Sequence, residues 1–271
     1  MASVERISTT VVKGTSLDHP ARITVGEHGY ARDRLFHFID EHGVMLSSKR
    51  FGPLIKLKSD YDDESNTLSI SFPDGGTVSA EAQLTDETVS TNFWGRPVGG
   101  IVVDGPFASA VGAYVGRTVR MVRAEVPGTA TDLHPVTIVS TATLDFFAKK
   151  YDGPLEHWRD RFRMLVEIAD LEPFEEESWS GRDVAIGDLV VSVLGSVPRC
   201  LVTQHNPRTG VKNFDTLKKL RLLRTQTTET QFPPKEDDPV YGGFLLGMYA
   251  AVAQPGEVAQ GDAVRVLTRA N

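Results

Sequence analysis

Alternation of apolar and polar residues at every second position is the dominant pattern of this chain. Residues 67–80 follow it on both sides of an Asp-Gly-Gly turn, and residues 32–50 follow it around a Glu-His-Gly turn. Successive side chains of a strand point to opposite faces, so both segments predict β-hairpins. Residues 187–195 and 261–268 echo each other, since each begins with Gly-Asp and continues with alternating Val and Leu. Repeated turn-to-strand units of this kind indicate a small barrel or curled sheet.

Helical periodicity is rarer and is clearest over residues 140–153. Apolar residues recur there at positions i, i+3, i+4 and i+7, after a Ser-Thr pair that can cap the helix and before a Gly that can end it. Segments 105–116 and 214–224 are two further helix candidates. The sequence therefore predicts a mainly β fold with some α (α+β). We expect two domains, 1–118 and 119–271, of which the second is a β-barrel with peripheral helices.

Composition and charge exclude several kinds of partner. The net charge is −7, and no cluster of Lys and Arg is dense enough to suggest nucleic-acid binding. The N-terminus lacks the apolar core of a secretion signal, and the longest apolar run, 243–253, is too short to span a membrane. One cysteine excludes an internal disulfide and any all-cysteine zinc or iron–sulfur site. We expect a protein of the reducing cytoplasm that acts on a small molecule.

That single cysteine, Cys200, is the main candidate for chemistry. A free cysteine is usually a small buried apolar group, but Pro198 ends the preceding strand pattern, Arg199 supplies a cation that favours the thiolate, and a polar stretch follows. As a nucleophile, Cys200 would need a base such as His205 or His134, and no triad signature is visible. As a metal ligand, one thiolate suits a soft or high-valent metal, whose other ligands a cofactor would have to supply.

Several positions could bind the anionic end of such a cofactor. Each has a simpler interpretation as a helix cap, a solvated turn or an ordinary ion pair. These positions are the Ser140-Thr141 helix start, the loop at Lys13, and the arginine pairs Arg32/Arg34 and Arg161/Arg163. The seven histidines show no metal-binding spacing, and no P-loop, GxGxxG or GxSxG element is present.

Seven motifs, in one order along nearly the whole chain, resemble a known family. The second half resembles the MOSC domain, named after the C-terminal domain of molybdenum cofactor sulfurase. The first half resembles the β-rich domain that precedes it in the mitochondrial amidoxime-reducing component and its bacterial relatives. The motifs are a Lys loop at Lys13, RDR at 32–34, VSTATL at 139–144, RFR at 161–163, FEEESW at 174–179, IGD at 186–188, and PRCLVTQHNPRTG at 198–210 with LKKLR at 217–221.

The resemblance implies a specific cofactor and reaction. It implies that Cys200 ligates the molybdenum of a pterin-based cofactor (molybdopterin), with no role for pyridoxal phosphate. It further implies that other residues hold the pterin and its phosphate, namely Lys13, Arg32, Ser140, Thr141 and Arg163. The family's activity would be reduction of N-hydroxylated compounds by oxygen-atom transfer. Since no Cys-rich ferredoxin domain is present, electrons would come from a separate donor protein.

Four departures from the family pattern keep two alternatives open. Gly14 replaces a Ser, Met164-Leu165 replace Pro-Asn, Asn206 replaces an Asp, and Met248 stands where relatives carry Asn or Gln. Fewer polar groups would then surround the pterin. The first alternative is a carrier of the cofactor or of sulfur, held as a persulfide on Cys200. The second is a MOSC enzyme that acts on a small metabolite without molybdenum.

Overall fold

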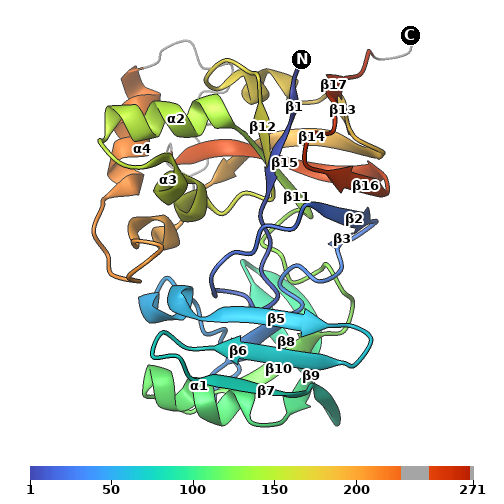
Figure 1. The fold of residues 1–271 in the computed structure, drawn as a ribbon, viewed down its shortest axis with the longest axis vertical. Coiled ribbons are helices and arrows are strands. Elements are labelled where there is room, and N and C mark those ends of the chain that lie inside the picture. The colour runs from blue at the N-terminus through green and yellow to red at the C-terminus, as the bar shows by residue number, and fades with distance from the viewer. Residues whose placement is uncertain (227–243, 269–271) are drawn as a thin grey trace.

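The computed structural model describes residues 1–226 and 244–268, which form two lobes stacked along the long axis (Figure 1). The upper lobe is built on a seven-stranded sheet with the order β1-β12-β11-β15-β14-β13-β17. Its strands are β1 (Ser3–Ile7), β11 (Val136–Ser140), β12 (Val166–Ala169), β13 (Asp183–Ile186), β14 (Leu189–Pro198), β15 (Leu245–Gln254) and β17 (Val264–Val266). The sheet curls into the predicted barrel, and its inward-facing Val, Ile and Leu side chains form the core.

The first strand of the chain closes this barrel against its last strands. The N–H of Val4 donates to the carbonyl of Asp262 (2.8 Å), and the N–H of Val264 donates to the carbonyl of Ala2 (2.9 Å). A second set of strands from both chain ends forms a three-stranded sheet beside it: β2 (Arg22–Gly26), β3 (Gly29–Tyr30) and β16 (Gly256–Ala259). Strands β1 and β2, from the first 30 residues, therefore pair with strands of the second half of the chain. The domain boundary expected at residue 118 stays a prediction.

Three helices of the described ranges cover the barrel, and the sequence predicted two of them, over 140–153 and 214–224. They are α2 (Thr141–Lys150), α3 (Leu155–Phe162) and α4 (Thr216–Gln226). The prediction over 140–153 is confirmed: the Ser140 side chain accepts a hydrogen bond from the N–H of Thr143, and two lysines lie in the last turn near the negative end of the helix dipole. Across residues 1–226 and 244–268, none of the helices has the length and apolar composition of a membrane span.

The lower lobe consists of two antiparallel sheets, α1 (Phe107–Val115) and the short 3-10 helix η1 (Gly52–Lys56). One sheet contains β4 (Phe36–Ile39), β10 (Arg120–Ala124), β9 (Arg96–Asp104) and β8 (Gln83–Phe93); the other contains β5 (Lys58–Asp62), β6 (Thr67–Ser71) and β7 (Thr77–Glu81). The hairpin predicted over 67–80 is confirmed as β6–β7. The turn predicted at 41–43 follows β4, and a single bridge between Ile39 and Met45 joins its arms.

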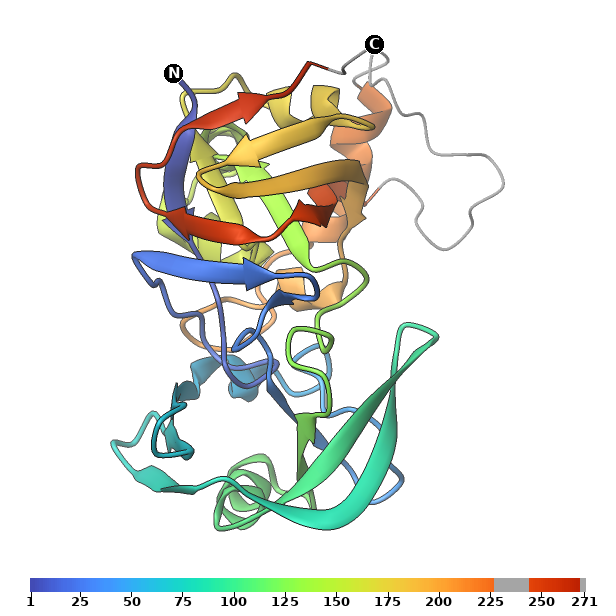
Figure 2. The ribbon, with the colours of Figure 1, turned by 90° about the vertical axis from the view of Figure 1, so that its right-hand side faces the viewer.

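Two features of the lower lobe reach the upper one. The long β8–β9 hairpin extends from the lower lobe up toward the barrel (Figure 2). On another side, η1 packs against the loop 206–211 through two glycines. A Cβ on Gly52 would lie 1.9 Å from the carbonyl oxygen of Gly210 and 2.7 Å from Cδ2 of His205. The lobes are thus in backbone contact at a point where no side chain fits.

Replacing Gly52 by Ala should therefore destabilise the protein. Backbone on one side of the contact must move, and overpacking of this kind lowers the unfolding midpoint by roughly 2–12 °C in a chain of this size. Thermal unfolding followed by circular dichroism measures the change. Gly195→Ala is the matched control, because a Cβ there meets nothing within 4 Å. Equal midpoints for the two variants would contradict the contact.

Candidate functional site

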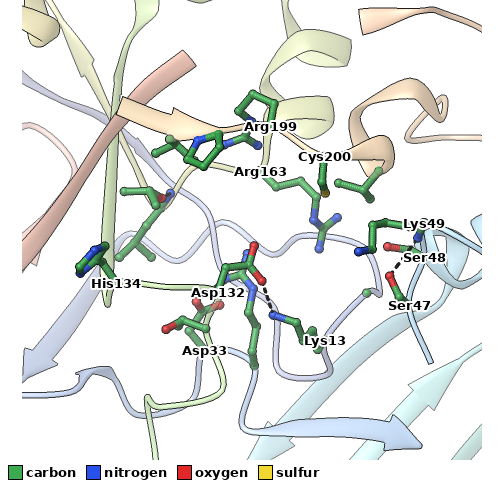
Figure 3. Close-up of a pocket in the computed structure, with 18 of the residues that line it drawn as sticks. Lys13, Asp33, Ser47, Ser48, Lys49, Asp132, His134, Arg163, Arg199 and Cys200 are labelled. Carbon is green, nitrogen blue, oxygen red and sulfur yellow. Dashed lines mark hydrogen bonds and ion pairs between the residues drawn. The ribbon is translucent and has the colours of Figure 1, made fainter. Parts of the chain in front are cut away.

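A cavity with about 920 Å³ of empty space, counting its open mouth, lies where the two lobes meet (Figure 3). Segments far apart in sequence line it: the loop after β1, the approach to β4 and the loop after it, the connection into β11, the turn after α3, and the end of β14. The polar lining residues are Lys13, Asp33, Arg34, Ser47, Ser48, Lys49, Thr131, Asp132, His134, Thr137, Arg163, Arg199, Cys200 and Tyr249.

Cys200 lies on this cavity, half-buried, directly after the end of β14. Its sulfur faces the cavity near Lys49 (Figure 3). Burial raises the pKa of the thiol, Asp132 raises it further, and Arg199 and Lys49 offset only part of this effect. The expectation that Arg199 favours the thiolate is therefore outweighed, and the free protein holds a thiol at neutral pH.

Positive charge dominates the lining, which carries five cationic side chains and two carboxylates. Lys13 donates to Asp132 (2.8 Å) and to the carbonyl of Ala130 (3.2 Å). Burial lowers the pKa of Lys13 despite that ion pair. The pKa of Asp132 is also lowered, because Lys13 and Arg34 together outweigh the effect of burial on the carboxylate. This pair is neutral overall, and Arg34 forms a second pair with Asp33. Lys49, Arg163 and Arg199 are left without a carboxylate partner among the described residues.

Two half-buried arginines of the cavity have no carboxylate partner among the described residues. Arg163 donates to the carbonyl of Thr15 (2.7 Å). Arg199 donates to the carbonyl of Phe162 and to the sulfur of Met164 (3.1 Å), while its Nε is buried without a partner in the described ranges. Burial lowers the pKa of both, and that of Arg163 falls to about 10. A buried guanidinium without a counterion is costly, so this arrangement suits a bound anion.

Backbone conformation supports a functional role for this cluster. Arg34 and Arg163 have φ values of +57° and +54°, in the left-handed region that residues other than glycine rarely adopt. Arg163 is the residue at which α3 ends. Strained positions of this kind gather at binding sites, because the surrounding structure must be built to maintain them. Both strained residues point a cation into the cavity.

Of the residues predicted for the cofactor, the structure brings Lys13, Arg163 and Cys200 together. Arg32 lies outside the cavity and faces Asp60 (3.7 Å) and Asp63 (3.5 Å) on the surface. The second arginine of the RDR motif, Arg34, lines the cavity in its place. The two side chains point in different directions because the chain turns between them.

Ser140 and Thr141 also lie outside the lining of the cavity. The fully buried Ser140 caps α2, and Thr141 donates to Glu167 (2.8 Å). Buried Glu176 accepts from Thr143 (3.2 Å) beside the helix start, and burial raises its pKa. The α2 N-terminus is therefore satisfied within the protein. This matches the simpler interpretation of the Ser-Thr pair as a helix cap.

No histidine is placed as a base for Cys200 in the part of the chain that the structure describes. His134 lines the cavity but packs its ring edge-on against Tyr249 (5.0 Å between centroids). Burial and then Arg96 lower its pKa. No group of three or more His, Cys, Asp or Glu that could hold a metal occurs among the described residues. A metal here would need ligands beyond the protein.

The four departures from the family pattern have local explanations. Gly14 has φ +94°, a backbone that glycine tolerates and serine does not. The amide oxygen of Asn206 accepts from the N–H groups of Arg208 (2.9 Å) and Thr209 (3.2 Å), as an aspartate would. Met164 packs on Gly247, where a Cβ would lie 2.4 Å from its Cε. Met164 therefore packs on the glycine that precedes Met248 in β15.

Comparison with known proteins identifies the family. The family model for the MOSC domain matches residues 127–265, about half of the chain. The chain belongs to the MOSC domain family, which confirms the resemblance seen in its motifs.

Individual relatives extend the similarity to the first half. Mitochondrial amidoxime-reducing component 1 of Mus musculus is 24% identical over 280 residues, covering 94% of this chain and 78% of that protein. Molybdenum cofactor sulfurase of Danio rerio is 25% identical over 234 residues, covering 74% of this chain and 28% of that protein. Among solved structures, the YuaD protein of Bacillus subtilis matches 98% of this chain and 96% of its own, with 11% identity and a TM-score of 0.43.

The environment of Cys200 predicts its reactivity. Because the pKa of the thiol is raised, alkylation by iodoacetamide should be slow at pH 7. The midpoint, the pH at which the alkylation rate reaches half its maximum, should lie above the usual thiol value of about 8.5. Asp132→Asn removes a negative charge that disfavours the thiolate, so the midpoint should move to lower pH. Rates measured from pH 6 to 10 by mass spectrometry report on this thiol alone, since it is the single cysteine.

Asp86→Asn controls for the change in net charge, because Asp86 lies exposed on β8, away from the cavity. Its midpoint should match that of the unmodified protein. An Asp132→Asn midpoint equal to the control would show that the cavity does not couple these two residues.

Proposed function

We propose that this protein binds a molybdenum–pterin cofactor through Cys200 and reduces N-hydroxylated compounds. One observation carries the proposal: a single thiol shares a cavity with two half-buried arginines that have no carboxylate partner among the described residues. The names of the relatives, an amidoxime-reducing component and a molybdenum cofactor sulfurase, point to the same chemistry.

The side chains of the cavity fit such a cofactor. It needs one sulfur ligand from the protein, and Cys200 is the only cysteine. It is anionic at its phosphate end, and the uncompensated charges of Arg163 and Arg199 suit that end. Lys13 would contribute a further donor, while Arg34 is already paired with Asp33. We therefore keep Lys13, Arg163 and Cys200 as cofactor residues, add Arg199, and do not retain Arg32, Ser140 and Thr141.

Each residue would have a distinct task. When bound, the cofactor supplies a two-electron centre that takes the oxygen atom of an N–OH group. Cys200 must lose its proton to act as a ligand, and its raised pKa means that this proton is released on binding. The apolar lining at Leu165, Val197 and Val202 limits the water around the reacting atoms.

The overall reaction requires a reductant. An amidoxime is reduced to an amidine and water, which consumes two electrons and two protons. We propose that a separate redox protein supplies the electrons and that the protons come from solvent through the open mouth of the cavity.

Molybdenum content tests the proposal. Protein made in a host that synthesises the cofactor should contain molybdenum and a pterin, measured by elemental analysis and by fluorescence after oxidation. Cys200→Ala should lower the molybdenum content by roughly tenfold or more, because a metal ligand is lost. Arg163→Gln and Arg199→Gln should lower the pterin content, since each removes a cation from the anionic end.

Arg265→Gln is the matched control, because Arg265 is exposed on β17 at a distance from the cavity. It should load as the unmodified chain does. Absence of molybdenum from the unmodified chain, or equal loading of Cys200→Ala, would defeat the proposal. A mass increase of about 32 Da on Cys200 without molybdenum would instead support a persulfide carrier.

A further inference from the structure

Trp94 differs from the other two tryptophans of the chain. It is 46% exposed, whereas Trp158 and Trp179 are each 4% exposed. It forms the tip of the β8–β9 hairpin with Gly95, and both residues have positive φ values, +57° and +88°. This two-residue turn ordinarily selects Asn-Gly, and a bulky aromatic residue at its first position is unfavourable. A costly residue in an exposed position points to a role outside folding.

The indole ring is held at the mouth of the cavity by two residues that line it. The ammonium of Lys49 lies 3.7 Å from the ring centroid, and the indole N–H donates to Asp132 (3.3 Å). Lys49 and Cys200 both line the cavity, and their side chains lie near each other there (Figure 3). Lys49 forms no ion pair within residues 1–226 and 244–268. Lys49 is therefore a neighbour of both the indole ring and Cys200.

Attachment of the hairpin does not require Trp94. Arg96, two residues on, donates to the carbonyls of Thr129 (2.8 Å), Thr131 (3.0 Å) and Asp132 (3.1 Å). These three bonds already fix the hairpin to the connection between β10 and β11. A small polar residue at position 94 would suit the turn better and leave this anchor intact.

We infer that Trp94 is a binding surface for a flat aromatic group of the substrate, at the outer end of the cavity. The substrate's ring stacks on the indole, while its N-hydroxylated end reaches inward past Lys49 toward Cys200. The inference rests on the proposed function and names the substrate class: aryl amidoximes are preferred over alkyl amidoximes. Stacking of aromatic rings gives a preference of about 2- to 10-fold in affinity.

A binding experiment tests this preference without catalysis. The purified full chain is titrated with benzamidoxime and with acetamidoxime in the absence of an electron donor, so that no turnover occurs. Trp94 is the one half-exposed tryptophan, so benzamidoxime should change the tryptophan fluorescence more than acetamidoxime does. Isothermal titration calorimetry gives the ratio of the two dissociation constants for each variant.

Three variants define the outcome. Trp94→Ala should lose the preference for benzamidoxime, and Trp94→Phe should keep part of it. Leu84→Ala removes an exposed apolar side chain from the other end of the same strand and should keep all of it. Thermal unfolding confirms that each variant is folded.

The results separate this inference from the proposed function. An unchanged ratio in Trp94→Ala, or equal affinity of the unmodified chain for the two compounds, overturns the role of Trp94 even if molybdenum is present. A preference that depends on Trp94 supports the aromatic site even if the chain proves to contain no molybdenum.

Discussion

An excess of half-buried positive charge at the junction of the two lobes is the constraint on which the site depends. Lys13 and Asp132 compensate each other, but Arg163 and Arg199 are held by carbonyls and a thioether rather than by carboxylates. Such an arrangement survives only if the rest of the fold maintains it, and if a bound anion repays part of its cost. The features that hold this arrangement in place are the barrel, the left-handed backbone at Arg163 and the contact between η1 and the loop 206–211.

Much of the fold could be predicted because it depends on local patterns. The period of two over 67–80 specified a hairpin, and the capped, amphipathic segment 140–153 specified α2. The pairing of β1 with β12 and of β2 with β16 could not be predicted. These strands are brought together by packing across the whole chain, and single-sequence periodicity carries no information about which strands become neighbours.

The site could be predicted only where a local signal in the sequence marked a residue. Cys200 could be found because it is unique and follows a strand-ending Pro, and Lys13 and Arg163 because their motifs resemble a family. The sequence could not show that Arg34, rather than Arg32, lines the cavity. Arg34 has a left-handed backbone, and the sequence does not indicate this conformation. Asp132 lies in a stretch without periodicity, so nothing marked it. The Ser-Thr pair at 140–141 looked like an anion site, but Ser140 already accepts from the N–H of Thr143 and Thr141 already donates to Glu167.

The closure of the barrel by β1 has a consequence for how the protein is made. Synthesis proceeds from the N-terminus, so this strand leaves the ribosome long before residues 262–264, which complete its pairing. Residues 36–124 contain the strands of the lower lobe and can acquire structure while translation continues. Until residues 262–264 emerge, the edge of β1 that faces away from β12 has no partner, and such edges attract other chains. The nascent chain is therefore exposed to aggregation until residues 262–264 emerge, and shielding of β1 by chaperones would protect the yield of folded protein.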